Sequence, residues 1–162
     1  MHCILVIDKP KGVTSFDVVR EVRRALGVKK VGHTGTLDPM ATGVLPVCIG
    51  DATKIAQYLT DAGKSYDATI RLGVTTDTLD ADGRILAERP IVALETERIE
   101  NALSKFRGTF LQTPPMYSAV KVGGKRLYEL ARAGEEIDRK PREVTVTSLV
   151  LRDFSSTELQ IS

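Results

Sequence analysis

The order of strand-like and helix-like segments constrains this fold most. A short apolar run at residues 3–7 precedes an amphipathic segment at 14–27, and further strand and helix patterns follow irregularly to the last residues. The chain shows neither an internal repeat nor a regular succession of strand, helix and parallel strand. This mixture is typical of α+β proteins. We therefore expect an α+β fold with a mixed, mainly antiparallel sheet flanked by helices.

The segment at 14–27 carries the local signals of a helix. Thr14 followed by Asp17 resembles a capping box, and Gly27 is suited to end the helix. Its valines, leucine and arginines are predicted to occupy two different faces of the helix. The apolar ones, predicted to face inward, are Val18, Val19, Val22 and Leu26, and the basic ones, predicted to lie away from them, are Arg20, Arg23 and Arg24.

Other segments give specific structural expectations. Pro46 interrupts the strand pattern "GVLPVCIG", which predicts an edge strand or a bulge because proline cannot donate to a ladder. The segment "DADG" signals a hairpin, and the Gly123–Gly124 pair is expected to form a turn. Two sets of side chains are each expected on one apolar face: Tyr66, Ala68, Ile70 and Leu72 on a strand, and Ile99, Leu103 and Phe106 on a helix.

Charge and composition restrict the functional classes. Residues 1–30 hold seven lysines and arginines against three acids, whereas residues 61–100 hold five against nine. This asymmetry suits a face that binds anions, although a solvated helix face explains a basic cluster equally well. The two cysteines do not suggest a disulfide framework and suit a reducing compartment. With only two histidines as well, the chain provides no closed zinc site of the usual ligand types. No signal peptide or membrane-spanning run is present, which predicts a cytoplasmic protein without membrane contact.

The glycine-rich stretch "VGHTGTLDPMATGVLP" is the strongest candidate for chemistry. A phosphate-binding loop is excluded, because Gly43 is followed by Val44 rather than by a lysine and a hydroxyl. A metal site is disfavoured because His33 and Asp38 have no third ligand nearby. One chemical interpretation remains: Asp38 is a nucleophile or base held by a stiff loop. The structural alternative is that Asp38 caps a turn.

Four segments together resemble the TruB family of pseudouridine synthases. They are "LVIDKPKGVTSFDVV", "GHTGTLDPMATGVLPVCIGDATK", "KSYDATIRLGVTTDTLDADG" and "QTPPMYSAVKVGGKRLYELARAG", and they cover nearly the whole chain in the family's order. The resemblance implies the pseudouridine synthase fold and the isomerisation of uridine 55 in the T loop of tRNA. It also implies that no cofactor is needed, since nothing is oxidised and no group is donated.

The resemblance also implies roles for single residues. Asp38 is expected to be catalytic, by attack on the sugar, attack on the base, or abstraction of a sugar proton. Tyr66 is expected to lie against the flipped base, although alternation alone predicts a core tyrosine. His33 is expected beside the flipped nucleotide, although a turn residue is the simpler interpretation. Lys9 is expected to buttress the loop, with substrate binding as a second role. Beside these roles, the basic cluster offers contacts to RNA phosphates, with a solvated helix face as the alternative; its members are Arg20, Arg23, Arg24, Lys29 and Lys30.

One family feature has no counterpart in residues 1–162. The family carries a later glycine–tyrosine–(isoleucine or valine)–arginine segment, whose arginine is expected to pair with the catalytic aspartate, and a C-terminal RNA-binding domain. We therefore expect residues 1–162 to be an incomplete catalytic domain, truncated at the C-terminus, that binds the tRNA T stem-loop as a monomer. The alternative function is a tRNA-binding or tRNA-folding module that is inactive as this fragment.

Overall fold

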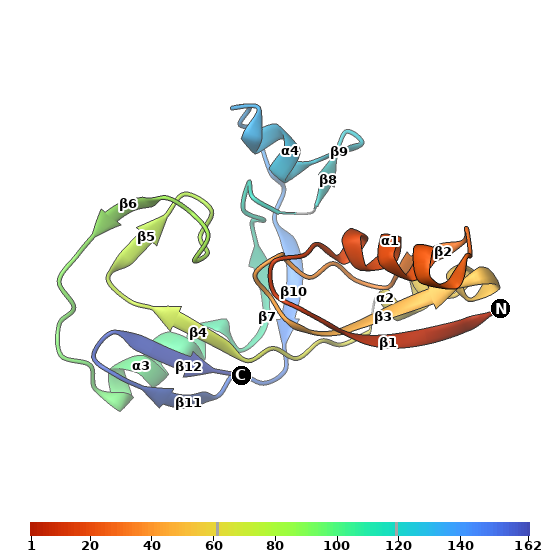
Figure 1. The fold of residues 1–162 in the computed structure, drawn as a ribbon. Helices are drawn as coiled ribbons and strands as arrows, with labels where there is room; N and C mark the ends of the chain where they lie inside the picture. The colour runs from red at the N-terminus through yellow and green to blue at the C-terminus, as the bar shows by residue number, and fades with distance from the viewer. Residues whose placement is uncertain (61, 119) are drawn as a thin grey trace. The chain divides into compact units, whose positions relative to one another are not determined.

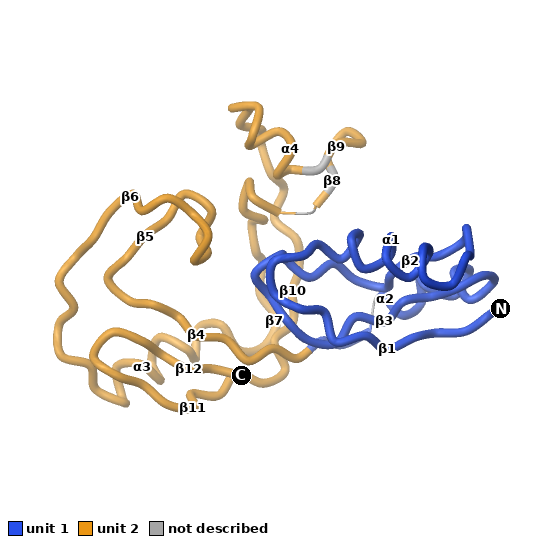
Figure 2. Tube along the Cα trace, in the orientation of Figure 1, with its two compact units in different colours: residues 1–64 blue, residues 65–162 orange. Residues whose placement is uncertain are grey.

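The computed structural model describes residues 1–60, 62–118 and 120–162. They form two compact units, Met1–Lys64 and Ser65–Ser162 (Figure 2). Both units combine helices with strands (Figure 1), and every strand pairing among the described residues is antiparallel. The expected α+β class with antiparallel pairing is therefore confirmed.

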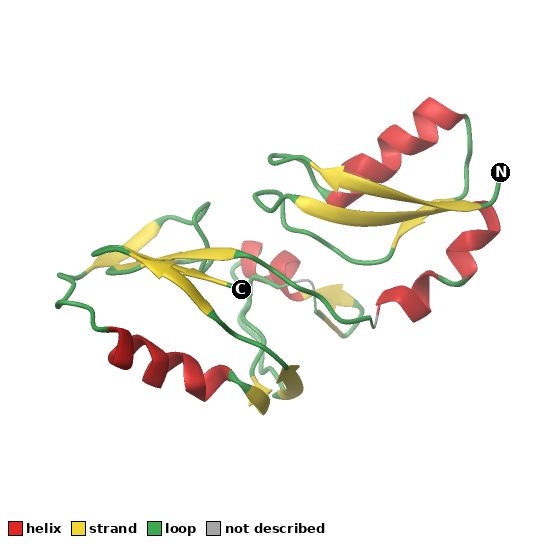
Figure 3. Ribbon diagram, turned by 90° about the horizontal axis from the view of Figure 1, so that it is seen from below, coloured by secondary structure: helices red, strands yellow, loops and turns green. Residues whose placement is uncertain are grey.

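The first unit is a three-stranded sheet with a helix against one face (Figure 3). The strand order is β1-β3-β2, and the register places Cys3 opposite Ile49 and Lys9 opposite Gly43. The unit comprises β1 (Cys3–Lys9), α1 (Ser15–Leu26), β2 (Val31–His33), β3 (Gly43–Ile49), the 3-10 helix η1 (Gly50–Lys54) and α2 (Ala56–Thr60).

Helix α1 begins and ends where its sequence predicts. The Thr14 hydroxyl accepts from the Asp17 N–H, and the Asp17 carboxylate accepts from the Thr14 N–H, so the capping box is complete. Gly27 ends the helix with a left-handed φ of 62°, a conformation that favours glycine. The buried valines of α1 pack against β2 and β3; the whole cluster is Val18, Val19, Val22, Val31, Leu45, Val47 and Ile49.

The prediction for Leu26 is wrong. Its side chain is exposed, whereas Val28, which follows the Gly27 turn, packs against the core. A hydrophobic residue just after a glycine stop commonly makes this contact, because the turn brings the chain back over the end of the helix. The apolar stripe therefore continues through the turn instead of along the helix.

The prediction that Pro46 marks an edge strand or a bulge is also wrong. β3 is the central strand of its sheet, and its pairing with β1 runs through Pro46 without a shift in register. The carbonyl of Pro46 accepts from the Thr34 N–H at 3.1 Å, so the backbone of Pro46 faces β2. β2 ends at His33, one residue before Thr34. The N–H that proline lacks would therefore have bonded only beyond the end of this short strand, and its absence removes one hydrogen bond there.

The second unit contains a second three-stranded sheet, covered on one face by a helix (Figure 3). The strand order is β11-β12-β4, and Ile99 and Leu103 of the helix form a buried cluster with Leu159 of the central strand. The elements of this layer are β4 (Ala68–Arg71), α3 (Thr96–Leu103), β11 (Leu151–Phe154) and β12 (Glu158–Ile161).

Three two-stranded ribbons complete the second unit. The hairpin predicted at "DADG" is present as β5–β6, and the turn predicted at Gly123–Gly124 joins β8 to β9. The remaining elements are β5 (Val74–Thr76), β6 (Ile85–Glu88), the 3-10 helix η2 (Ser104–Phe106), β7 (Gly108–Gln112), β8 (Lys121–Val122), β9 (Lys125–Arg126), α4 (Leu127–Arg132) and β10 (Arg142–Val146).

The prediction that Phe106 shares the buried face of Ile99 and Leu103 is wrong. Phe106 is exposed because α3 ends at Leu103 and the next three residues form a 3-10 turn. A 3-10 turn has three residues per turn instead of 3.6, so the apolar face of the α-helix does not extend through it.

Candidate active site

Asp38 lies in a tight turn between β2 and β3, and its side chain is exposed. The carbonyl of Asp38 accepts from the Ala41 N–H at 3.0 Å, with Pro39 in the second position of the turn, as its fixed φ favours. The turn is therefore closed by the backbone of Asp38 and not by its carboxylate. Within the described part of its own unit, no hydrogen bond or ion pair engages that carboxylate. The geometry leaves it available to an incoming molecule.

The residue before Asp38 is anchored to helix α1. The Leu37 N–H donates to the Ser15 hydroxyl oxygen at 2.9 Å, and that hydroxyl lies 3.2 Å from the Leu37 carbonyl, to which it donates. Ser15 is buried, and the side chain of Leu37 packs against the core of the unit. The chain is thus fixed immediately before the carboxylate. Nothing in the local sequence pattern around Ser15 points to this partner, which lies 22 residues away.

The residue after Asp38 is anchored to the turn that follows β1. Lys9 is fully buried, and its ammonium group donates to the carbonyls of Pro10 (3.0 Å), Val13 (2.8 Å) and Pro39 (3.3 Å). The Pro39 carbonyl also accepts from the N–H of Gly12 at 2.7 Å. Three acceptors match the three donors of an ammonium group. Lys9 therefore buttresses the Asp38 turn as expected, and its contact with substrate stays a prediction.

His33 and Thr34 join the loop to the sheet. His33 is the last residue of β2, half-buried and opposite Val47. Thr34 is buried, and its N–H donates to the Pro46 carbonyl. His33 is therefore a strand residue at the entrance to the loop and not a turn residue. Its proposed place beside a flipped nucleotide stays a prediction.

Tyr66 belongs to the second unit and is 58% exposed. β4 begins only at Ala68, two residues after the tyrosine, so the expected strand is shorter than its pattern. All residues of β4 are exposed, including Ile70 at 39%. The interpretation of Tyr66 as an ordinary core tyrosine is therefore wrong. An exposed aromatic ring is free to stack on a planar group.

The basic side chains around α1 have different environments. Arg23 is half-buried, and its guanidinium donates to the Val31 carbonyl at 2.9 Å, which ties the helix to β2. Arg20 pairs with Asp17, and Arg24 pairs with Glu21. Arg23 therefore serves the fold. The other four basic residues of this region are exposed to solvent: Arg20, Arg24, Lys29 and Lys30.

Two carboxylates near this basic surface are held ionised by their neighbours. The hydrogen bonds from the Thr14 hydroxyl and backbone, followed by that from Arg20, lower the pKa of Asp17 to about 2. Hydrogen bonds from Lys54 and Lys30 lower the pKa of Asp51. Both acids partly neutralise the basic surface at neutral pH.

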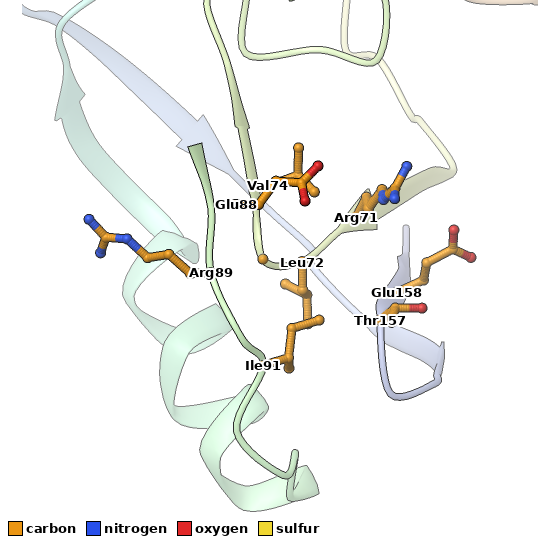
Figure 4. A pocket seen from close by; sticks show the side chains of 9 residues that line it. Arg71, Leu72, Val74, Glu88, Arg89, Ile91, Thr157 and Glu158 are labelled. Carbon is orange, nitrogen blue, oxygen red and sulfur yellow. The ribbon is translucent and has the colours of Figure 1, made fainter. Parts of the chain in front are cut away.

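The second unit also contains a pocket, in the region between β4, β6 and the turn before β12 (Figure 4). Leu72 and Ile91 lie together there, while Arg71 and Arg89 point away on opposite sides. None of the candidate residues lines it. In the described part of the chain, no three metal-ligating side chains gather to hold a metal ion, and no helix is long and apolar enough to cross a membrane.

The sequence of residues 23–162 decides the family. This range matches the family described as "TruB family pseudouridylate synthase (N terminal domain)". The chain belongs to the TruB family. It is 54% identical over 154 residues to tRNA pseudouridine synthase B of Geobacillus kaustophilus and 56% identical over 149 residues to that of Clostridium kluyveri. These alignments cover 94% and 92% of the chain but 54% and 51% of the relatives, so the chain spans about half their length.

Solved structures agree with the TruB assignment. A crystal structure of a Cbf5–Nop10–Gar1 complex matches with a TM-score of 0.69 at 28% identity, over 98% of this chain and 37% of that chain. An H/ACA RNP bound to a substrate RNA containing 2′-deoxyuridine matches with a TM-score of 0.66 at 24% identity, over 98% of this chain and 36% of that chain, which supports the fold alone. The expected pseudouridine synthase fold is confirmed.

Proposed function

We propose that this chain isomerises uridine to pseudouridine at position 55 in the T loop of tRNA, in the cytoplasm, with Asp38 as the catalytic residue. Its membership of the TruB family and its identity to proteins named tRNA pseudouridine synthase B support tRNA as the substrate. The observation that carries the proposal is the exposed Asp38 carboxylate on a backbone anchored on both sides. A preorganised nucleophile or base needs this combination of access and rigidity.

The reaction needs three changes at one nucleotide. The bond between ribose C1′ and uracil N1 breaks, the base rotates, and C5 bonds to C1′. A proton leaves C5 and N1 gains one, so that the product is an isomer of the substrate. A carboxylate starts this sequence by attacking the sugar or the base, or by removing a sugar proton. No electron acceptor or group donor takes part. Asp38 therefore supplies the group that starts the proposed reaction, and no cofactor is required.

The target uracil has to leave its stack before Asp38 reaches it. Flipping a base costs a few kcal/mol, and stacking on an aromatic ring returns roughly 1–3 kcal/mol per base. The exposed ring of Tyr66 is proposed to provide that stacking, with its hydroxyl near the proton lost from C5. His33 is proposed to support the rearranged T loop. The exposed arginines and lysines around α1 are proposed to position the RNA through its phosphates.

The deciding experiment measures tritium release from a T-arm stem-loop labelled at uracil C5. The wild-type chain is expected to release tritium, and Asp38→Asn is expected to release none while binding the RNA. Asp8→Asn is the matched control, because Asp8 is an exposed aspartate in the same unit. An active Asp38→Asn protein would refute the assignment of the catalytic residue.

One observation favours a second candidate function. Within the described part of the first unit, no lysine, arginine or histidine forms an ion pair with Asp38. A neighbouring cation would hold the carboxylate ionised and oriented. The second candidate is therefore a module that binds tRNA without modifying it. Salt-dependent binding of the T-arm hairpin by a wild-type chain that releases no tritium would select this function.

A further inference from the structure

Ser15 makes two hydrogen bonds to one residue of the Asp38 loop. Its hydroxyl oxygen accepts from the Leu37 N–H at 2.9 Å and lies 3.2 Å from the Leu37 carbonyl, to which its proton is directed. The side chain is 2% exposed, so water does not replace these bonds. A hydroxyl has one proton to donate. In this structure that proton is committed to the loop.

The two bonds fix the chain on both sides of the Leu37 α-carbon. A residue in an antiparallel ladder is held in the same way, by exchanging an N–H and a carbonyl bond with the residue opposite. The carbonyl of Leu37 belongs to the planar peptide group that carries the nitrogen of Asp38. Fixing that plane fixes the Asp38 nitrogen and α-carbon, the point from which the side chain leaves the backbone.

Helix α1 does not need the Ser15 hydroxyl for its own N-terminus. The capping box is made by Thr14 and Asp17, and Ser15 is the first residue inside the helix. Thr14 makes its side-chain hydrogen bonds with Asp17 and none with the loop at residues 34–42 in the described part of the unit. Two adjacent hydroxyls therefore have separate partners: one caps the helix and the other holds the loop.

We propose that Ser15 is a positioning residue for the proposed reaction, which holds the peptide between Leu37 and Asp38 so that the carboxylate faces the uridine. The proposal rests on the proposed function. Lys9 and Gly12 hold the chain only after Asp38, at Pro39. Without Ser15 the peptide before Asp38 loses both of these hydrogen bonds, and on that side only the packing of the Leu37 side chain is left among the described contacts. Misplacing a reacting group by about 1 Å costs roughly 100-fold in rate.

The test compares Ser15→Ala with Thr14→Ala, its neighbour on the same helix, and with Ser15→Thr, which keeps a hydroxyl. Two quantities are measured: steady-state tritium release from the T-arm substrate, and the hydrogen-exchange rate of the Leu37 amide by NMR. Ser15→Ala is expected to lower kcat roughly 10- to 100-fold with KM within about twofold, and to speed Leu37 exchange about tenfold. Thr14→Ala is expected to leave kcat and Leu37 exchange within about twofold even though it weakens the helix.

The outcomes separate the proposal from the proposed function. A kcat loss in Thr14→Ala equal to that in Ser15→Ala would reduce Ser15 to a general stabiliser and overturn the proposal, whereas recovery of kcat in Ser15→Thr supports it. Unchanged exchange of Leu37 in Ser15→Ala also overturns the proposal, whatever the activity. A wild-type chain that releases no tritium refutes the proposed function and, with it, the catalytic half of this proposal; the exchange rates then decide only whether Ser15 orders the loop.

Discussion

Asp38 and Tyr66 are both exposed, but the segments that carry them differ. The residues on either side of Asp38 are hydrogen-bonded to the buried side chains of Ser15 and Lys9. Tyr66 precedes a four-residue strand of which every residue is exposed. The backbone of the proposed catalytic residue is thus held inside its own unit, whereas among the described residues neither Ser65 nor Asp67, the neighbours of Tyr66, is hydrogen-bonded to a buried side chain.

This difference matches the two proposed tasks. A nucleophile or base has to meet one atom in one direction, and small displacements are expensive. A stacking ring meets a broad flat surface, and such contacts tolerate variation in position. The comparison predicts that changes around Asp38 act through the fold, whereas changes at Tyr66 act through the RNA.

The largest effect is expected for Lys9→Met. Removing the buried ammonium leaves the carbonyls of Val13 and Pro39 without their strongest donor, and we expect a loss of roughly 3 kcal/mol in the free energy of unfolding of the first unit. Urea dependence of hydrogen exchange at β3 amides measures it. Lys11→Met is the control, because Lys11 is exposed, and it should change this free energy by less than about 0.5 kcal/mol. Equal effects of the two substitutions would contradict the role of Lys9 in holding the Asp38 turn.

Tyr66→Ala should show the opposite profile. We expect a change of less than about 0.5 kcal/mol in stability, because the ring is exposed, and a loss of about 1–3 kcal/mol in the free energy of binding to the T-arm hairpin. Fluorescence anisotropy in the Asp38→Asn background measures binding without turnover. Tyr66→Phe should bind normally and slow product formation. If Tyr66→Ala destabilised the unit by several kcal/mol, the contrast with Asp38 would fail.

Thr14→Ala gives a smaller effect that tests how far helix α1 supports the loop. Loss of an N-cap hydroxyl costs about 1 kcal/mol, which we expect to see as a lower urea midpoint for the first unit. Because the Asp38 loop depends on Ser15 and Lys9, its hydrogen bonds should survive this loss. If Thr14→Ala speeds the exchange of the loop amides as much as that of the first-turn amides of α1, the cap and the loop are coupled.

The smallest effect concerns pH. The folded-state pKa of Asp17, about 2, lies below its ordinary value of 3.8, so folding favours the ionised carboxylate. The stability that it contributes is complete above about pH 4 and is lost as the pH falls through about 2. The difference in melting temperature between wild type and Asp17→Asn should therefore be constant from pH 7 to about pH 5 and shrink towards pH 2. A constant difference down to pH 2 would exclude this origin.

Local signals predicted much of the fold. The limits of α1 follow from Thr14, Asp17 and Gly27, since caps and stops act within one helical turn. Strand order is not local, and the sequence therefore placed Pro46 at an edge although β3 is central. Alternation placed Tyr66 on the apolar face of a strand, but β4 begins only at Ala68 and all of its residues are exposed, because burial depends on what packs against a strand and not on its own pattern. The loop pattern made Asp38 a candidate, and its catalytic role stays a prediction, whereas Ser15 was missed because its partner is Leu37, 22 residues away.

The register of β1 against β3 determines which charge faces the Asp38 turn. Lys9 is the last residue of β1, opposite Gly43, and Asp8 precedes it on the other face of the sheet. A slip of one residue would exchange the faces of these two side chains. The carboxylate of Asp8 would then meet the carbonyls of Val13 and Pro39 with no proton to offer them. A misregistered sheet is thus penalised electrostatically at the turn, so the correct strand pairing and the formed Asp38 turn stabilise each other.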